Sequence, residues 1–250
     1  MERGDLEIWL NHFEHHARRP FRLEPGLADA LRPDEKRLIA RSLAVVQLVE
    51  PSEALRARVA AERFARAREI PQLARIIELL IEEEKRHATL VREFMCDHQL
   101  PLRRAHWIDR VFRRIRGLGG LHLYLWVQLC AELIGIVFYR ALEVATGCER
   151  LQRLCRLIVA DELAHIGFES QLLGSMRAGR AGPGRALERA AHLTFFASAV
   201  LVVWATHRAV LRRAGHGARS FLRSCLAQYE FYLAPACLPL ERSHAASSSG

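Results

Sequence analysis

The sequence lacks the paired cysteines that hold structural zinc or staple small secreted proteins. Its six cysteines are scattered, and no two of them form a C-x-x-C pair. Six thiols at these spacings do not make a disulfide framework for a chain of 250 residues. We therefore expect reduced thiols and a cytoplasmic protein.

Lysine is also nearly absent, since it occurs only at positions 36 and 85. The formal charge of +9 is therefore carried almost entirely by arginine. A net positive charge permits contact with phosphates or acidic partners, but it carries no information about the fold.

A leader segment and long apolar runs are missing too. The first residues, Met1 to Asp5, show no charged-then-apolar pattern, so we expect no signal peptide. The longest apolar stretch, 193–205, contains Thr194 and Ser198 and is shorter than the ~20 residues that a membrane span needs. We interpret it as a buried helix and expect no membrane association.

An alternating strand pattern is absent from the chain. Glycine and proline are sparse in its middle, whereas Ala, Leu, Arg and Glu recur, which favours helix. The sequence therefore predicts an all-α protein. A proline-punctuated lead-in, 1–33, contains a short helix whose histidines His12, His15 and His16 we interpret as solvent-facing.

Hydrophobic periodicity and the proline and glycine positions divide the rest of the chain into helices. The first begins at Asp34, is interrupted at Pro51 and resumes, and the second begins at Pro71. The others cover about 121–145, 149–176, 186–213 and 218–233. The predicted domains are a lead-in (1–33), a four-helix bundle (34–178), accessory helices packed on it or forming a homodimer face (179–240), and a disordered tail (241–250).

Two Glu-x-x-His motifs stand out, Glu84 with His87 and Glu162 with His165. Residues three apart on a helix share a face, so each motif directs a carboxylate and an imidazole to the same place. One such motif arises easily by chance. Two of them, each within an apolar stripe, favour a shared chemical role.

The spacing of two further glutamates repeats around the two predicted turns. Glu132 precedes Glu162 by 30 residues, and their midpoint is Gly147. Glu53 precedes Glu84 by 31 residues, with the midpoint at 68/69, just ahead of a proline. Residues equidistant from the turn of an antiparallel hairpin lie level with each other, so each hairpin aligns one Glu with one Glu-x-x-His. This pattern builds di-metal carboxylate bundles.

Metal ions would resolve the electrostatic conflict that these side chains create. Four carboxylates on apolar helix faces repel one another unless they are protonated or compensated. Two divalent cations would neutralise them, and oxygen ligands with one imidazole per metal suit iron or manganese better than zinc. Glu50 remains an alternative to Glu53, since the two share a face and differ by only ~4.5 Å along the axis.

The residues around the motifs extend this pattern to a known family. Glu83-Glu84-x-Arg86-His87 and Asp161-Glu162-x-x-His165 resemble the [DE]-E-x-R-H signature of the ferritin-like superfamily of di-iron carboxylate proteins, over about residues 34–178. The resemblance implies a ferritin-like four-helix bundle with two bound irons. It also implies that Asp161 orients His87 and that Glu83 orients His165. Ala164 stands where arginine is usual in the second copy.

Departures from the family narrow the choice among its branches. The chain lacks the cysteine-rich module of rubrerythrin-type proteins, and Ile158 stands where the amine N-oxygenase branch has a further histidine. Cage ferritins are shorter and lack the long 97–120 connection and the two added helices. The organisation is most similar to that of bacterial ferritin-like proteins.

This resemblance implies an oxidase or hydroxylase that uses the iron pair, O₂, a small organic substrate and an electron donor protein. Tyr139, two turns from Glu132, is either a radical or proton relay or an ordinary core tyrosine. The alternative function is iron handling, as a ferroxidase or peroxide scavenger. A third interpretation uses the basic segment 103–116 to contact a tRNA or carrier protein, although a solvated connection is the simpler explanation.

Overall fold

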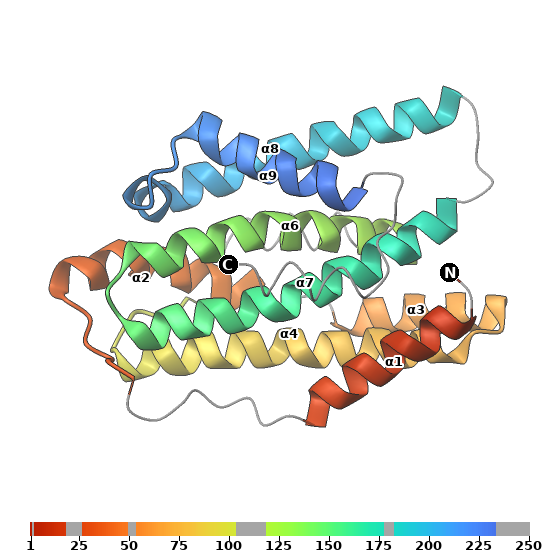
Figure 1. The fold of residues 1–250 in the computed structure, drawn as a ribbon, viewed down its shortest axis with the longest axis horizontal. Helices are drawn as coiled ribbons and strands as arrows, with labels where there is room; N and C mark the ends of the chain where they lie inside the picture. Colours follow the sequence, from red (N-terminus) through yellow and green to blue (C-terminus); the bar gives the residue numbers. More distant parts are fainter. Residues whose placement is uncertain (2, 19–26, 50–53, 104–118, 178–182, 234–250) are drawn as a thin grey trace. The chain divides into compact units, whose positions relative to one another are not determined.

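The computed structural model describes residues 1, 3–18, 27–49, 54–103, 119–177 and 183–233. These residues form eight α-helices and no strand (Figure 1), which confirms the predicted all-α class. The helices are α1 (Arg3–Arg18), α2 (Pro33–Val49), α3 (Ala54–Arg68), α4 (Pro71–Asp97), α6 (Leu121–Ala145), α7 (Glu149–Arg177), α8 (Pro183–Arg213) and α9 (Ala218–Leu233).

The chain divides into two compact units, which we describe separately. The first unit comprises residues 1–127 and 148–154, and the second comprises 128–147 and 155–250. The predicted boundaries at residues 33, 178 and 240 stay predictions. The predicted disordered tail at 241–250 lies outside the described residues.

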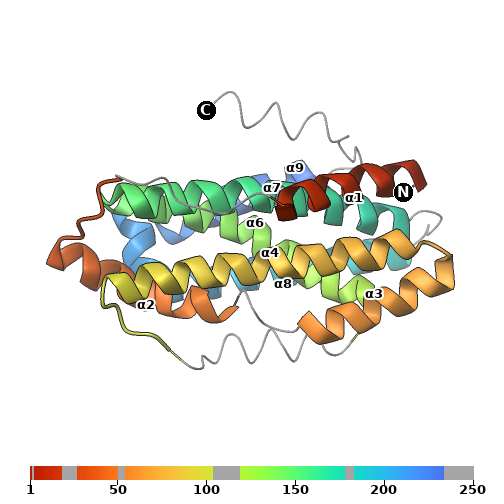
Figure 2. The same ribbon diagram turned by 90° about the horizontal axis from the view of Figure 1, so that it is seen from below.

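In the first unit, α1, α2 and α3 all pack against α4 (Figures 1 and 2). Pro71 starts α4, where its missing N–H costs no helical hydrogen bond. From there the helix buries an apolar stripe that includes Leu73, Ile76 and Ile77. The lead-in helix α1 buries its own apolar stripe, so it is part of the packed unit.

The turn between α3 and α4 lies where the spacing of the glutamates predicts it. Glu69 adopts a left-handed conformation with φ 55°, which ends α3. The N–H of Ile70 then donates to the carbonyl of Ala65 at 3.0 Å, and α4 begins at the next residue. The predicted hairpin turn near 68/69 is confirmed.

An ion-pair cluster links these two helices and predicts a pH-dependent stability. On α4, Arg75 donates to Glu78 at 2.7 Å, and Arg58 of α3 also pairs with Glu78. The hydrogen bond from Arg75 is the largest cause of a lowered pKa at Glu78, against an ordinary value of 4.5. A carboxylate with a lowered pKa stabilises the fold above its ordinary pKa, and this contribution is lost as the pH falls through the lowered value.

Glu78→Gln is therefore expected to reduce the free energy of unfolding by about 0.5–1 kcal/mol at neutral pH. The difference from wild type should shrink as the pH falls below the ordinary glutamate pKa. Urea unfolding across this pH range measures it. Glu93→Gln, on the exposed face of the same helix, is the control. A deficit that stays constant down to low pH would contradict the ion-pair explanation.

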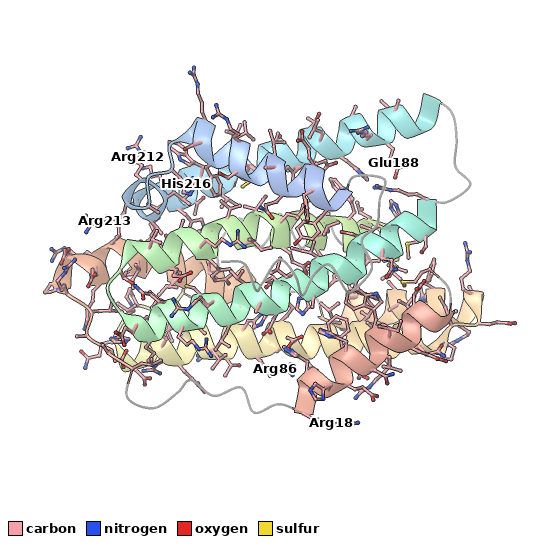
Figure 3. All side chains as sticks on the ribbon, in the orientation of Figure 1. Arg18, Arg86, Glu188, Arg212, Arg213 and His216 are labelled. Atoms are coloured by element: carbon pink, nitrogen blue, oxygen red, sulfur yellow. The ribbon has the colours of Figure 1, made fainter. Side chains whose placement is uncertain are left out.

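The second unit contains most of α6 and α7 together with α8 and α9, and α8 and α9 lie side by side (Figure 1). Their connection turns through Gly215, which has φ 84°, a conformation that suits glycine. Figure 3 shows Arg212, Arg213 and His216 at this turn. The indole N–H of Trp204 donates to the carbonyl of His216 at 3.4 Å and ties the turn back to α8.

The prediction that 193–205 is a buried helix is wrong in part. The segment is helical, and Phe196 and Val200 are fully buried, but Leu193 and Leu201 are 42% and 50% exposed. One face of α8 is packed and another is exposed, although its apolar residues occur all round the helix and not on a single stripe. Apolar composition therefore overstated the burial of this helix.

By length and composition alone, two described helical segments would be able to cross a membrane. One is Leu121–Ala145, whose apolar window is 67% buried, and the other is Ala186–Arg213, whose window is 28% buried. Core helices of soluble proteins meet the same criterion, so the first carries little weight. The expectation of no membrane association stays a prediction.

Candidate metal centre

Two carboxylates and one imidazole gather in the interior of the second unit. Glu132 comes from α6, whereas Glu162 and His165 come from α7, and none of the three side chains is more than 5% exposed. His165 Nδ1 lies 3.4 Å from Glu162 Oε2 and 3.8 Å from Glu132 Oε1. One ligand atom from each residue lies within 4.8 Å of the other two, a set that is able to hold a metal ion.

The turn between α6 and α7 explains why these residues meet. The first helix ends at Ala145 and the second begins at Glu149, so the turn surrounds Gly147 as predicted. Nearer the turn, Arg156 Nη1 donates to Glu143 Oε1 at 2.7 Å and forms a partly exposed bridge between the two helices. In this hairpin, the prediction that the single Glu lies level with the Glu-x-x-His motif is confirmed.

A neighbouring amide orients one of the carboxylates. Gln128 Nε2 donates to Glu132 Oε1 at 3.2 Å, one turn away on α6. The side chain of Glu132 is only 3% exposed, so water has little access to its oxygens. A carboxylate fixed in this way presents its oxygens in a defined direction, as metal ligands require.

The first unit buries the other Glu-x-x-His motif on α4. Glu84 is 8% exposed and His87 is fully buried. Beside them, Glu83 Oε1 accepts hydrogen bonds from Arg86 at 3.0 Å and lies 2.7 Å from His16 Nδ1 on α1. The prediction that His16 faces solvent is wrong, because the packing of α1 on α4 brings its ring to Glu83.

The described residues leave several of the predicted site residues untested. Glu53 and its alternative Glu50 lie outside the described residues, as does 104–118, which contains most of the basic segment. Of that segment, Arg103 is described, and its carbonyl accepts from Gln47 Nε2 at 2.7 Å. The proposed pairings of Glu83 with His165 and of Asp161 with His87 stay predictions, although Glu83 and Asp161 are both buried.

Tyr139 occupies a core position on α6. Its side chain is 4% exposed, and its ring meets that of Phe138 edge-on at 5.5 Å. A Cβ added at Gly135 would lie 3.9 Å from Tyr139, an ordinary contact that leaves room for alanine. The two interpretations of Tyr139, a relay or an ordinary core residue, both stay predictions.

Glu169 on α7 is a buried acid that was not predicted from the sequence, and it is 1% exposed. It lies four residues after His165, so helical spacing alone placed it on the same face. Burial raises the pKa of the Cys130 thiol well above its ordinary value, and the charge of Glu169 adds to this, whereas Arg177 opposes it. Glu169 therefore extends the acidic interior of the second unit beyond the Glu-x-x-His motif.

Comparison of the sequence with models of known protein families and with curated proteins found no match.

Proposed function

We propose that the chain is a ferritin-like di-metal carboxylate protein that binds two iron ions and acts as an O₂-dependent oxidase or hydroxylase. Manganese would satisfy the same ligand set. The proposed ligands are Glu53, Glu84, His87, Glu132, Glu162 and His165. Glu83 and Asp161 are proposed as the acids that orient the two histidines.

The observation that carries the proposal is the group formed by Glu132, Glu162 and His165. Two ionised carboxylates this close together in a protein interior are costly, and one imidazolium offsets only one of them. A divalent cation would offset both, with the imidazole as a neutral ligand. Two carboxylates with one imidazole match the oxygen-rich sites that hold iron or manganese.

The first unit supplies the corresponding half of the proposed centre. Glu84 and His87 are buried and share one face of α4. In each hairpin, a single glutamate precedes the Glu-x-x-His motif by 30 or 31 residues. The described side chains test this arrangement only in the α6–α7 hairpin. We propose that each hairpin provides three of the six ligands.

Bound iron would supply electrons for the reduction of O₂ and the means to oxidise an organic substrate. The residues of the chain would hold the ions, fix their geometry and keep water away. In this arrangement, Gln128 orients Glu132 and the burial of His165 excludes solvent. Tyr139 lies on the same helix, two turns from Glu132, and is proposed as a relay for an electron or a proton.

The proposal is tested by the reaction of the iron-loaded protein with O₂. Protein loaded anaerobically with two Fe²⁺ per chain is mixed with O₂, and O₂ consumption is followed together with the near-ultraviolet absorbance of Fe³⁺. Wild type and Glu143→Gln, which removes a carboxylate from α6 nearer the turn, are expected to react. Glu162→Gln is expected to lose at least about 10-fold in rate. Equal rates in all three proteins would contradict the proposal.

Excess Fe²⁺ distinguishes the oxidase from the iron-handling alternative. An oxidase should stop after one turnover until an electron donor is added. Continued oxidation of many irons per chain without a donor would indicate a ferroxidase. Salt-dependent retention of the protein on RNA would instead favour a hydroxylase of tRNA bases.

A further inference from the structure

Three segments of the first unit meet at a second group of ligand-type side chains. Asp29 precedes α2, His98 follows the last residue of α4, and Cys148 directly precedes α7. Asp29 Oδ1 lies 2.7 Å from His98 Nε2 and 3.7 Å from Cys148 Sγ. One ligand atom from each of the three lies within 4.8 Å of the other two. We propose that this group binds a single zinc-type divalent ion, independently of the di-iron centre.

The ligand chemistry separates this site from the proposed iron centre. A thiolate, an imidazole and a carboxylate are ligands that Zn²⁺ accepts readily, whereas the iron centre is rich in carboxylates. With one thiolate and one carboxylate, the two charges of the ion would be neutralised. A fourth position would be taken by water, since the Asp29 side chain is 41% exposed.

The geometry is close to what a tetrahedral ion requires. Zinc bonds of about 2.0–2.3 Å at tetrahedral angles separate two ligand atoms by about 3.3–3.6 Å. The Asp29–Cys148 separation of 3.7 Å is near this range. The Asp29–His98 separation of 2.7 Å is a hydrogen-bond distance and would open by about 0.6 Å around an ion. This change requires only small side-chain rotations.

A neighbouring arginine holds the Asp29 carboxylate in place. Arg150 Nη1 donates to Asp29 Oδ2 at 3.0 Å, which leaves Oδ1 directed at His98 and Cys148. Such an outer hydrogen bond to a ligating carboxylate is a common feature of metal sites. Arg150 Nη2 also donates to Asp97 at 2.5 Å, so the positive charge of this arginine is shared between two carboxylates and repels a cation less.

Further contacts hold His98 and the loop that carries Asp29. Lys36 Nζ donates to the carbonyl of His98 at 3.2 Å, and the ring of Phe94 packs on the His98 ring at a centroid distance of 4.3 Å. Glu149 Oε2 accepts from the N–H of Ala28 at 3.1 Å, which ties the loop before α2 to the start of α7. A site fixed on helix ends in this way is largely formed before an ion binds.

Cobalt(II) provides a readout that responds only to a cysteine ligand. Thiolate bound to Co²⁺ gives a sulfur-to-metal charge-transfer band in the near ultraviolet, and the proposed iron centre contains no cysteine. Wild type titrated with Co²⁺ is expected to show this band with a final intensity that corresponds to one thiolate-bound ion per chain, and Zn²⁺ should displace it. Cys148→Ser should lose the band and bind Zn²⁺ at least about 10-fold more weakly.

Matched variants keep the test independent of the iron centre. Cys96→Ser, which changes an exposed thiol on α4, and Glu162→Gln, which changes a proposed iron ligand, should both retain the band. His98→Gln provides a second ligand variant, and circular dichroism checks that each variant is folded. Absence of the band in wild type, or its persistence in folded Cys148→Ser, would overturn the proposal.

Discussion

Replacing Glu132 with glutamine is expected to stabilise the metal-free protein and to destabilise the metal-loaded protein. Without metal, Glu132 is a buried carboxylate beside the carboxylate of Glu162, each within 4 Å of His165 Nδ1. Glutamine has nearly the same shape and carries no charge, so it removes the repulsion and part of the desolvation cost. The remaining side-chain oxygen still accepts from Gln128.

The expected gain in the metal-free protein is about 1–2 kcal/mol, or about 2–8 °C in Tm for a chain of this size. In the loaded protein the sign reverses, because each tenfold loss in metal affinity removes about 1.4 kcal/mol of the stabilisation that the ion provides. Thermal unfolding with chelator and with excess Fe²⁺ under anaerobic conditions measures both values. Glu143→Gln should change each by less than about 1 kcal/mol. A Glu132→Gln effect of the same sign in both forms would contradict a metal-ligand role.

Trp9→Ala is expected to cost about 3–5 kcal/mol, since it removes the largest buried side chain of α1. Trp9 and Phe13 are each 2% exposed and stack at 5.9 Å within the face that packs on α4. The corresponding fall in Tm is about 6–20 °C. Ile8→Ala, on the exposed face of the same helix, should change stability by no more than about 0.5 kcal/mol.

Urea unfolding of the two α1 variants under identical conditions makes this comparison. If Trp9→Ala were as mild as Ile8→Ala, α1 would not be packed on α4 as the structure describes. The contact of His16 with Glu83 depends on the same packing. A chain in which α1 is not packed would therefore also lose this contact with Glu83, the acid directly before the Glu84–His87 motif.

Local patterns were sufficient to predict the helices and one half of the candidate centre. Pro71 begins α4, because proline suits the first position of a helix. Gly147 lies in the short turn between the end of α6 and the start of α7. Once the α6–α7 turn is placed, equal spacing on either side brings Glu132 to Glu162 and His165. Side-chain periodicity and chain geometry carry this information, and neither depends on distant contacts.

Contacts between distant segments could not be predicted in the same way. The apolar face of α1 indicates that the helix packs somewhere, but only the fold shows that it packs on α4 and brings His16 to Glu83. Asp29 and Cys148 are 119 residues apart and share no motif, so their meeting depends on tertiary packing. The error at 193–205 has another cause, since apolar residues all round a helix indicate hydrophobicity without saying which face is covered.

Bound metal per chain is the most direct test of the central claim, the di-metal centre. The protein would be expressed with iron, purified, loaded anaerobically with Fe²⁺ and analysed for metal content, beside folded Glu132→Ala. The account predicts close to two irons per wild-type chain and fewer than one in the variant. A well-folded wild-type chain that holds no stoichiometric iron or manganese after anaerobic loading would contradict it.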